Sequence, residues 1–311
     1  MKAVLQYRAS PELRQRIGAL DLPTVIVDEA DKDMFLREMR DADVLLHVLE
    51  PVTAVVIDAA LRLKLIQKIG IGVNTIDLGA ARRRGVAVCN MPGTNTQAVA
   101  EMTLLLMLAT LRGLARLDDL TRIGKGWELD PKISDDFGEL SGRTVGLVGF
   151  GAVGRRLAPM LQAIGAKVVY TSRRPAADSP IAFLPFRELL PVADLLSLHL
   201  PLTAETTGMI GAAAFAAMKR GSVLINTARG PLVDETALCA ALTSGHLRGA
   251  GLDVFSREPV SPDDPLLRLP NVVVTPHLAW LTAETLERSL AVISENCRRL
   301  LTGGALLHRV V

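Results

Sequence analysis

The sequence predicts an α/β protein made of two doubly wound, parallel-sheet domains. Short apolar runs alternate with helical patterns through the first third of the chain, and longer apolar runs alternate with helices from Thr144 onward. Such alternation is typical of parallel sheets, because each crossover helix returns the chain to the starting edge of the sheet. A third observation is a glycine-rich turn, Gly149–Gly154, directly after the first strand of the second series.

The first series predicts one parallel sheet with helices between its strands. Each apolar run is short and is bounded by polar or glycine residues, as expected for strands buried on both faces. The expected strands are Ala3–Gln6, Thr24–Val27, Val44–Val48, Leu65–Ile69 and Val86–Cys89, and the expected helices are Pro11–Ile17, Asp33–Asp41, Thr53–Leu61 and Asp77–Arg84.

The second series predicts a larger sheet. Its strands are more apolar, and their number matches a doubly wound nucleotide-binding domain. The expected strands are Thr144–Gly149, Lys167–Thr171, Leu195–Leu198, Ser222–Asn226, Gly251–Val254 and Val272–Thr275. A long apolar helix, Ala98–Arg112, separates the two series, a loop is expected over 124–137, and a helix, Thr282–Leu301, ends the chain.

The position of the glycine-rich turn predicts a discontinuous domain. The turn marks the first strand of a nucleotide-binding domain, so a full structural unit precedes that domain in the chain. The segment after Pro276 has the length of about one helix and a short strand and is expected to cross back onto the first unit. We therefore expect a substrate-binding domain of residues 1–97 plus 283–311, a dinucleotide-binding domain of residues 98–282, and a ligand cleft between them.

The glycine-rich turn itself predicts the cofactor class. Gly149, Gly151 and Gly154 lie between a buried strand and a helical stretch, which is the context of a Rossmann dinucleotide site. The first glycine allows a tight turn, the second lets the backbone approach a pyrophosphate, and the third lets helix and strand pack closely. The amides at the helix start, including those of Ala152 and Val153, would face the phosphates.

Composition argues against several other classes. The net charge of +2, the scattered basic residues and an aromatic content of 4% disfavour nucleic-acid binding. The longest apolar stretch, Met102–Leu111, is too short to span a bilayer. The first residues resemble a strand rather than a secretory signal, so a cytoplasmic protein without a membrane partner is expected.

The cysteines indicate neither disulfides nor a metal site. Cys89, Cys239 and Cys297 lie far apart without a CxxC pair, so we expect reduced thiols and no metal site.

Three strand ends of the second series have polar residues of complementary types. Arg229, Glu258 and His277 each follow one of these strands, and the carboxyl ends of parallel strands share one edge of a sheet. A histidine can protonate a carbonyl oxygen that receives hydride, a glutamate can orient the ring, and an arginine can bind a carboxylate in two places. This set predicts reduction of a 2-oxo acid to a 2-hydroxy acid.

These segments together resemble the D-isomer-specific 2-hydroxyacid dehydrogenase family over nearly the whole chain. Matching segments include 69–77, 92–101, 199–206, 226–230 and the three strand ends. The resemblance implies that the amides of Gly72 and Val73 bind the substrate carboxylate, with Val48, Leu49 and Trp280 also on the substrate side. It further implies cofactor contacts from His199, Leu200, Pro201, Thr206, Thr227, Ala228, Asp253 and His277, with Asp253 accepting a bond from the carboxamide. A homodimer formed through the nucleotide-binding domain is also implied.

The residues after the second strand of the nucleotide-binding domain predict the cofactor preference. An NAD site has an acidic residue there. This chain has Ser172, Arg173 and Arg174, which suit a 2′-phosphate, so NADP(H) is expected over NAD(H).

Substrate identity is less constrained. The pattern from Pro276 to Trp280 resembles the NADPH-dependent glyoxylate/hydroxypyruvate reductase branch, so a small 2-oxo acid and its D-2-hydroxy product are expected as ligands. The 47–49 segment has no arginine, which argues against a phosphorylated substrate such as 3-phosphoglycerate.

Two alternative functions remain: a reductase of larger 2-keto acids, such as 2-ketogluconate, and a nucleotide-sensing protein of the co-repressor type. Formate and phosphite dehydrogenases fit less well, because no glutamine is near His277 and the segment after the second strand is basic.

Overall fold

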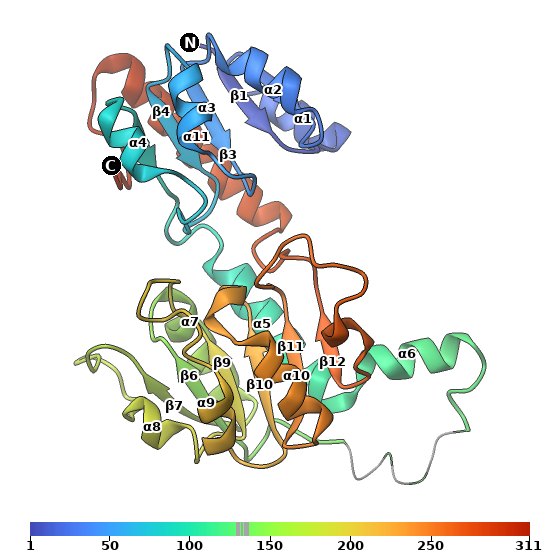
Figure 1. The fold of residues 1–311 in the computed structure, drawn as a ribbon. Coiled ribbons are helices and arrows are strands. Elements are labelled where there is room, and N and C mark those ends of the chain that lie inside the picture. Colours follow the sequence, from blue (N-terminus) through green and yellow to red (C-terminus); the bar gives the residue numbers. More distant parts are fainter. Residues whose placement is uncertain (129–130, 132, 134–136) are drawn as a thin grey trace. The chain divides into compact units, whose positions relative to one another are not determined.

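The structure, a computed structural model of residues 1–311, describes every residue except 129, 130, 132 and 134–136 (Figure 1). The chain divides into two units, which are described separately. Unit 1 contains residues Met1–Asn95 and Leu281–Val311, and unit 2 contains Thr96–Trp280. The sequence places these boundaries at 97/98 and 282/283. Part of the segment expected as a loop, 124–137, lies outside the described residues.

Unit 1 is built on a parallel five-stranded sheet with the order β2-β1-β3-β4-β5. Four of its helices begin with a side chain that caps a free backbone amide: Ser10 for α1, Asp31 for α2, Asp77 for α4 and Thr282 for α11. The strands are β1 (Ala3–Gln6), β2 (Thr24–Val27), β3 (Val44–His47), β4 (Leu65–Lys68) and β5 (Ala87–Cys89), and the helices are α1 (Pro11–Gly18), α2 (Lys32–Met39), α3 (Ala54–Ala59), α4 (Leu78–Arg83) and α11 (Ala283–Thr302).

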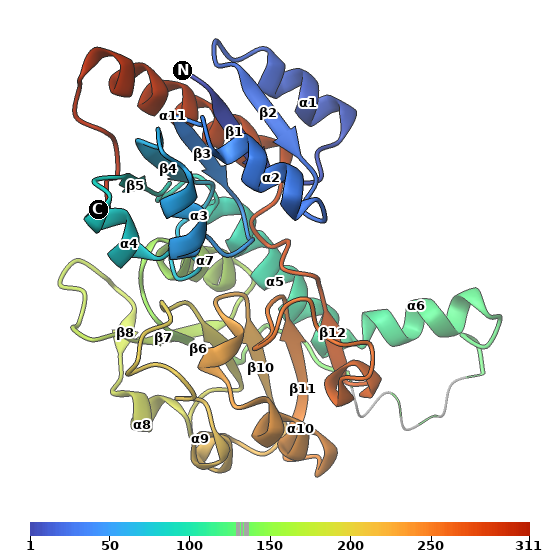
Figure 2. The ribbon, with the colours of Figure 1, turned by 45° about the horizontal axis from the view of Figure 1, so that its top comes forward.

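The last helix, α11, returns the chain to the sheet of unit 1 (Figure 2). Asn296 of α11 donates a hydrogen bond to the Gln67 side chain of β4 at 2.6 Å, and both residues are buried. After α11, Arg309 pairs with Cys89 of β5 in an isolated antiparallel bridge. The C-terminal segment thus packs on, and pairs with, the sheet whose first strand begins at Ala3. This packing explains why unit 1 is discontinuous in sequence.

Unit 2 is built on a parallel seven-stranded sheet with the order β12-β11-β10-β9-β6-β7-β8. The strand order reverses at β6, between β9 and β7, and ligands of open α/β sheets bind at such a switch point. The strands are β6 (Thr144–Val148), β7 (Lys167–Thr171), β8 (Ala182–Phe183), β9 (Leu195–Leu198), β10 (Ser222–Asn226), β11 (Leu247–Leu252) and β12 (Val272–Val274). The helices are α5 (Thr96–Arg112), α6 (Leu114–Arg122), α7 (Ala152–Ala163), α8 (Phe186–Leu189), α9 (Ala212–Ala217) and α10 (Glu235–Thr243), with 3-10 turns at Gly230–Leu232 and Pro265–Arg268.

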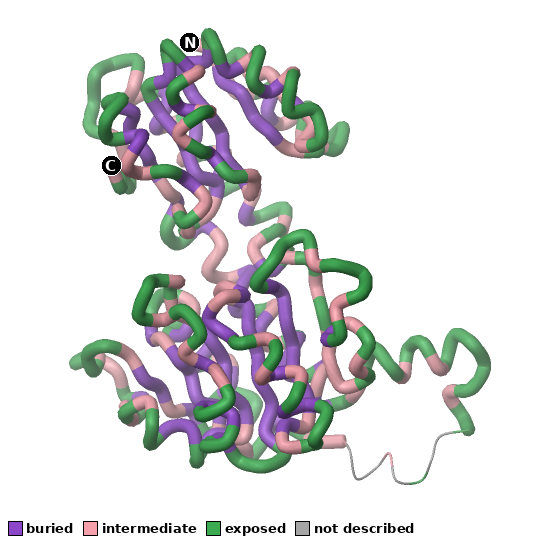
Figure 3. The backbone as a smooth tube through the Cα atoms, in the orientation of Figure 1, coloured by how far each residue is buried: buried purple, intermediate pink, exposed green. Residues whose placement is uncertain are grey.

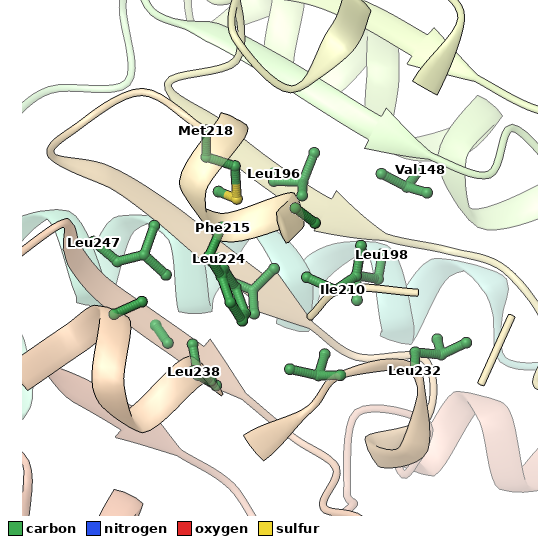
Figure 4. Close-up of a cluster of buried hydrophobic side chains, with 14 of the residues drawn as sticks. Val148, Leu196, Leu198, Ile210, Phe215, Met218, Leu224, Leu232, Leu238 and Leu247 are labelled. Carbon is green, nitrogen blue, oxygen red and sulfur yellow. The ribbon is translucent and has the colours of Figure 1, made fainter. Parts of the chain in front are cut away.

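Alternating side chains of this sheet contribute to two cores. Leu224 of β10 packs with Phe215 of α9 and Leu238 of α10 on one face (Figure 4). Its neighbours Val223 and Ile225 belong to the core on the other face, which α5 and α7 cover. This period of two is the geometry of a strand buried on both sides. Figure 3 shows that the buried residues follow the strands of both sheets.

The predicted fold class is confirmed, and several element boundaries differ. The second sheet has seven strands rather than six, because the two-residue strand β8 joins its edge. Strand β11 begins at Leu247 rather than Gly251, and the amphipathic helix α6 was not expected. Among the described residues, no single helix is long and apolar enough to cross a membrane; α5 and α6 meet that criterion only as a pair, which bends by 64°.

Candidate active site

Three neighbouring strands of unit 2 bring the predicted catalytic residues to one edge. Strands β10, β11 and β12 are adjacent and parallel, so their carboxyl ends lie side by side. Arg229 follows β10, Glu258 follows β11 and His277 follows β12. The register pairs Asn226 with Leu252, and the backbone of Gly230 approaches Phe255 so closely that an added Cβ would lie 1.9 Å from the Phe255 carbonyl carbon.

His277 and Glu258 are in direct contact. His277 Nδ1 lies 2.6 Å from Glu258 Oε2, and the two side chains are 20% and 34% exposed. The other oxygen of Glu258 accepts a hydrogen bond from the Phe255 amide at 2.9 Å. Burial raises the pKa of Glu258, but these hydrogen bonds and the charges of His277 and Arg229 bring it below its ordinary value. Glu258 therefore remains a carboxylate that orients the ring.

The backbone of His277 is held in an unusual conformation. Its φ of 56° lies in the left-handed region, which few residues other than glycine adopt. The His277 amide donates to the Asp253 carbonyl at 2.7 Å, and the His277 carbonyl accepts from the Trp280 indole at 3.0 Å. Strained backbone of this kind is concentrated at functional sites. Trp280, expected on the substrate side, thus contacts the histidine segment through its indole N–H.

Asp253 holds the segment that includes His277. It is 1% exposed, and its carboxylate accepts hydrogen bonds from Thr275 Oγ1 at 2.5 Å and from the amides of Leu278 and Ala279 at 2.9 Å each. Burial raises its pKa, while these hydrogen bonds lower it, with a net rise. The sequence identified Asp253 only through the family resemblance. Its contacts with 275–279 depend on the pairing of β11 with β12, and no sequence pattern showed them.

Arg229 lies beside this pair and is half-buried. Its Nη1 donates to the Ala228 carbonyl at 2.6 Å. Burial lowers its pKa and the charge of Glu258 opposes that shift, so the two groups are within electrostatic reach. Asn226, which sequence reasoning did not select, fixes this turn: its side chain donates to the Arg229 carbonyl at 2.9 Å and accepts from the Ala228 amide at 3.0 Å.

Thr227 is held by a contact with helix α5. Its hydroxyl lies 2.8 Å from that of Thr103 on α5, and both residues are buried. The turn 226–230 is thus held by side-chain hydrogen bonds at Asn226 and Thr227. Such anchoring favours a defined position for the Arg229 guanidinium.

The three glycines of the turn after β6 have different surroundings. Gly149 has a φ of +100°, and a Cβ there would lie 2.2 Å from the His199 carbonyl oxygen. A Cβ on Gly154 would lie 2.8 Å from the Gly149 carbonyl oxygen, whereas one on Gly151 would meet no atom within 4 Å. Gly151 caps α7 without a side-chain hydrogen bond, so the amides of Ala152 and Val153 begin the helix beside open space. A pyrophosphate fits that arrangement.

The segment Ser172–Arg174 follows β7, next to this turn in the sheet. The Arg173 and Arg174 side chains are exposed, and the Ser172 hydroxyl donates to the Arg174 carbonyl at 2.6 Å. A hydrogen bond from the Thr203 side chain is the largest cause that lowers the pKa of Glu205. The charge of Arg173 lowers the same pKa by a smaller amount. Because β7 and β9 flank β6 in the sheet, the basic segment after β7 and the turn around Glu205 after β9 lie on either side of the β6 strand end.

The segment 199–206 packs on the glycine turn from the β9 side. The His199 amide donates to the Val148 carbonyl at 2.7 Å, and its Nε2 lies 2.9 Å from Ser197 Oγ. Burial lowers the pKa of His199 to about 4, so the ring is neutral near pH 7. Thr206 Oγ1 donates to the Pro201 carbonyl at 2.9 Å, which closes the turn after Leu200.

The remaining predicted substrate-side residues lie in unit 1. Gly72 and Val73 follow β4, and no hydrogen bond from either amide is present in this described region. Val48 and Leu49 follow β3, the neighbouring strand, so both segments extend from one edge of the first sheet. The Val48 carbonyl accepts a hydrogen bond from Lys68 Nζ, a contact that sequence reasoning did not anticipate.

A metal site is not formed by the described residues: no three His, Cys, Asp or Glu side chains gather in them.

Comparisons with known proteins agree with this architecture. A family model described as D-isomer specific 2-hydroxyacid dehydrogenase, NAD binding domain, matches residues 104–279. The glyoxylate reductase of Korarchaeum cryptofilum is 38% identical over 278 residues, which are 86% of this chain and 83% of that protein. The D-3-phosphoglycerate dehydrogenase of Mycobacterium tuberculosis is 42% identical over 282 residues, 89% of this chain and 52% of that protein. The chain thus spans about half the length of that relative.

A solved structure extends the likeness to both units. The NADPH-dependent glyoxylate/hydroxypyruvate reductase of Sinorhizobium meliloti, in complex with NADP and malonate, has a TM-score of 0.85 and 30% identity. The likeness covers 100% of this chain and 96% of that one. The fold, the family model and these relatives together show that this chain belongs to the D-isomer-specific 2-hydroxyacid dehydrogenase family.

Proposed function

We propose that this protein reduces a small 2-oxo acid to its D-2-hydroxy acid with NADPH, and that glyoxylate and hydroxypyruvate are its best substrates. The observation that carries this proposal is the 2.6 Å contact of His277 Nδ1 with Glu258, beside Arg229. Relatives named glyoxylate reductase and hydroxypyruvate reductase support the substrate class.

His277 is the proposed proton donor. With Nδ1 donating to Glu258, the proton on Nε2 is available for the carbonyl oxygen of the substrate. Bound NADPH would supply the hydride that reduces the carbonyl carbon. Loss of the Nε2 proton leaves a neutral imidazole that Glu258 still orients through Nδ1.

Arg229 and the amides after β4 are the proposed anchors of the substrate. Arg229 would bind the carboxylate and polarise the adjacent carbonyl, since its planar guanidinium can donate to two oxygens at once. The amides of Gly72 and Val73 would donate to the same carboxylate. Val48, Leu49 and Trp280 would contact the rest of the substrate, and Asp253 would meet the carboxamide of the cofactor.

The residues present fit a dinucleotide. The open space at Gly151 and the uncapped start of α7 suit a pyrophosphate, with Ala152 and Val153 as amide donors. His199, Leu200, Pro201 and Thr206 would lie against the adenosine half, and Thr227 and Ala228 against the nicotinamide half.

A preference for NADP(H) is proposed from Ser172, Arg173 and Arg174. Their exposed cations and hydroxyl suit a 2′-phosphate. We expect Arg173→Asp to raise the KM for NADPH about tenfold or more and to change the KM for NADH less than about twofold. Arg187→Asp, at an exposed arginine of helix α8, is the matched control. Equal losses with both cofactors would contradict the 2′-phosphate role.

The test of the proposed function is an initial-rate assay. Oxidation of NADPH and of NADH is followed with glyoxylate, hydroxypyruvate, pyruvate and 2-ketogluconate, and the product is resolved on a chiral column. Fast NADPH-dependent formation of a D-2-hydroxy acid from either of the first two supports the proposal. Turnover of 2-ketogluconate alone would assign a larger substrate, and NADPH binding without turnover would favour a nucleotide sensor.

We also propose a homodimer formed through unit 2. Leu105 and Leu108 of α5 and Leu114 of α6 are 51%, 38% and 52% exposed, so these helices present apolar side chains to solvent. Apolar surface of this kind is frequent where subunits meet. Light scattering after size-exclusion chromatography is expected to give twice the chain mass of 33.3 kDa.

A further inference from the structure

Lys68 is a buried cation that the proposed reaction does not yet use. It ends β4 at 6% exposure and is the only buried lysine or arginine among the described residues. Removing an ammonium from water is costly, whereas an apolar side chain of similar length would fill the same space without that cost. A charge at this position therefore indicates a role that an apolar side chain could not have.

The contacts of Lys68 connect two strand-end segments. Its Nζ donates to the carbonyl of Val48, which follows β3. Its Cε lies 3.5 Å from the position that a Cβ on Gly70 would occupy, so the side chain runs along the turn that leads to Gly72 and Val73. The ammonium is thus located between the two segments that are expected to meet the substrate.

His47 adds no positive charge to this cluster. It is the register partner of Lys68 on β3, is 3% exposed, and its Nε2 lies 2.7 Å from the Glu50 carbonyl oxygen. Burial and the nearby charge of Lys68 lower the pKa of His47 to about 3. The ring is neutral near pH 7, so Lys68 is the source of positive charge at these two strand ends.

We propose that Lys68 is a positioning and specificity-determining residue that selects 2-oxo acids over neutral ketones. Its ammonium donates to the Val48 carbonyl and its side chain passes Gly70, so its positive charge lies at the start of the turn that leads to the amides of Gly72 and Val73. A carboxylate bound at those amides gains Coulomb stabilisation from this charge, and little water screens it because the group is buried. This inference rests on the proposed function, since it concerns the same substrate.

The experiment compares a charged substrate with its neutral ester. Pyruvate and methyl pyruvate present the same keto group, and only the acid has a carboxylate. For Lys68→Met we expect the KM of pyruvate to rise about tenfold, equivalent to about 1.4 kcal/mol, with kcat within about twofold. The KM of methyl pyruvate and that of NADPH are expected to change less than about twofold, so the ratio of acid to ester kcat/KM falls.

Two further variants separate charge from shape. Lys68→Arg keeps the charge and is expected to restore the acid-to-ester ratio to within about threefold of wild type. Lys64→Met removes an exposed lysine four residues earlier, 65% exposed and 3.8 Å from Asp43, and is expected to leave the ratio unchanged. Because the ratio is measured within one protein preparation, a loss of folded protein affects both substrates equally.

The outcomes distinguish this inference from the proposed function. A wild-type protein that reduces no 2-oxo acid overturns both. A wild-type protein that reduces pyruvate, together with a Lys68→Met variant that keeps the acid-to-ester ratio, overturns the role of Lys68 alone. Equal losses for acid and ester in Lys68→Met would also overturn it, because they indicate a purely structural contribution.

Discussion

His277 is constrained at both its ring and its backbone. Glu258 orients the ring from 2.6 Å, while hydrogen bonds to Asp253 and from Trp280 hold a backbone with φ of 56°. This combination has a practical consequence for mutagenesis. Asparagine tolerates the left-handed region better than most residues, so His277→Asn removes the imidazole with the least disturbance of the backbone.

We expect His277→Asn to lower kcat for reduction by about 10²–10⁴-fold, the usual contribution of a positioned proton donor. The affinity for NADPH, measured by fluorescence titration, is expected to stay within about twofold. Glu258→Gln is expected to lower kcat less, because the amide oxygen can still accept from Nδ1 and orient the ring, although the amide carries no charge. Turnover of His277→Asn close to that of wild type would remove His277 from the role of proton donor.

At the scale of elements, the glycines of β11 let helix α5 lie close to the sheet. A Cβ on Gly251 would be 2.9 Å from Ile225 Cδ1 and 3.0 Å from Leu106 Cβ. A Cβ on Gly249 would be 2.8 Å from Thr110 Cγ2. Since α5 also places Thr103 against Thr227, its distance from the sheet affects the turn beside Arg229.

We expect Gly251→Val to lower the free energy of unfolding by about 1–3 kcal/mol, as over-packing of a core does. Urea denaturation followed by circular dichroism measures this value. Gly18→Ala, at the end of α1 with no atom within 4 Å of the added Cβ, is the control and is expected to be neutral or slightly stabilising. A Gly251→Val variant as stable as wild type would show that α5 can move away without cost.

At the scale of the whole molecule, the buried neutral His47 makes stability depend on pH. Burial and Lys68 depress its pKa from 6.5 to about 3 in the folded protein. Between these values the unfolded chain binds the proton and the folded protein does not, so stability rises with pH in this window. The stabilisation is complete above pH 6.5 and is lost progressively as the pH falls toward 3.

The corresponding slope is at most about 1.4 kcal/mol per pH unit for one group. We expect His47→Gln to have a shallower dependence of unfolding free energy on pH than wild type between pH 6.5 and 4.5, and a parallel dependence above pH 7. Chemical denaturation at a series of pH values tests this. Identical slopes in the two proteins would show that His47 does not remain neutral in the folded state.

Local patterns predicted most of the elements. Strands β1, β2, β7, β9 and β10 begin and end at the residues expected from apolar runs. The pattern was wrong where glycine interrupts it: β11 extends back to Leu247, because Gly249 and Gly251 weaken the strand signal and are tolerated only through packing against α5. The short strand β8 was missed because its pairing with β7, rather than its two residues, defines it.

Sequence patterns alone predicted the fold class, the glycine turn after β6 and the three strand ends that hold Arg229, Glu258 and His277. These features follow from periodicity, turn chemistry and the rule that parallel strands share a carboxyl edge. The contacts by which Asp253 holds the 275–279 segment, and the burial of Lys68 against Val48, are visible only in the folded chain. Those contacts join residues far apart in the chain, so their geometry depends on strand pairing and packing that no local pattern encodes.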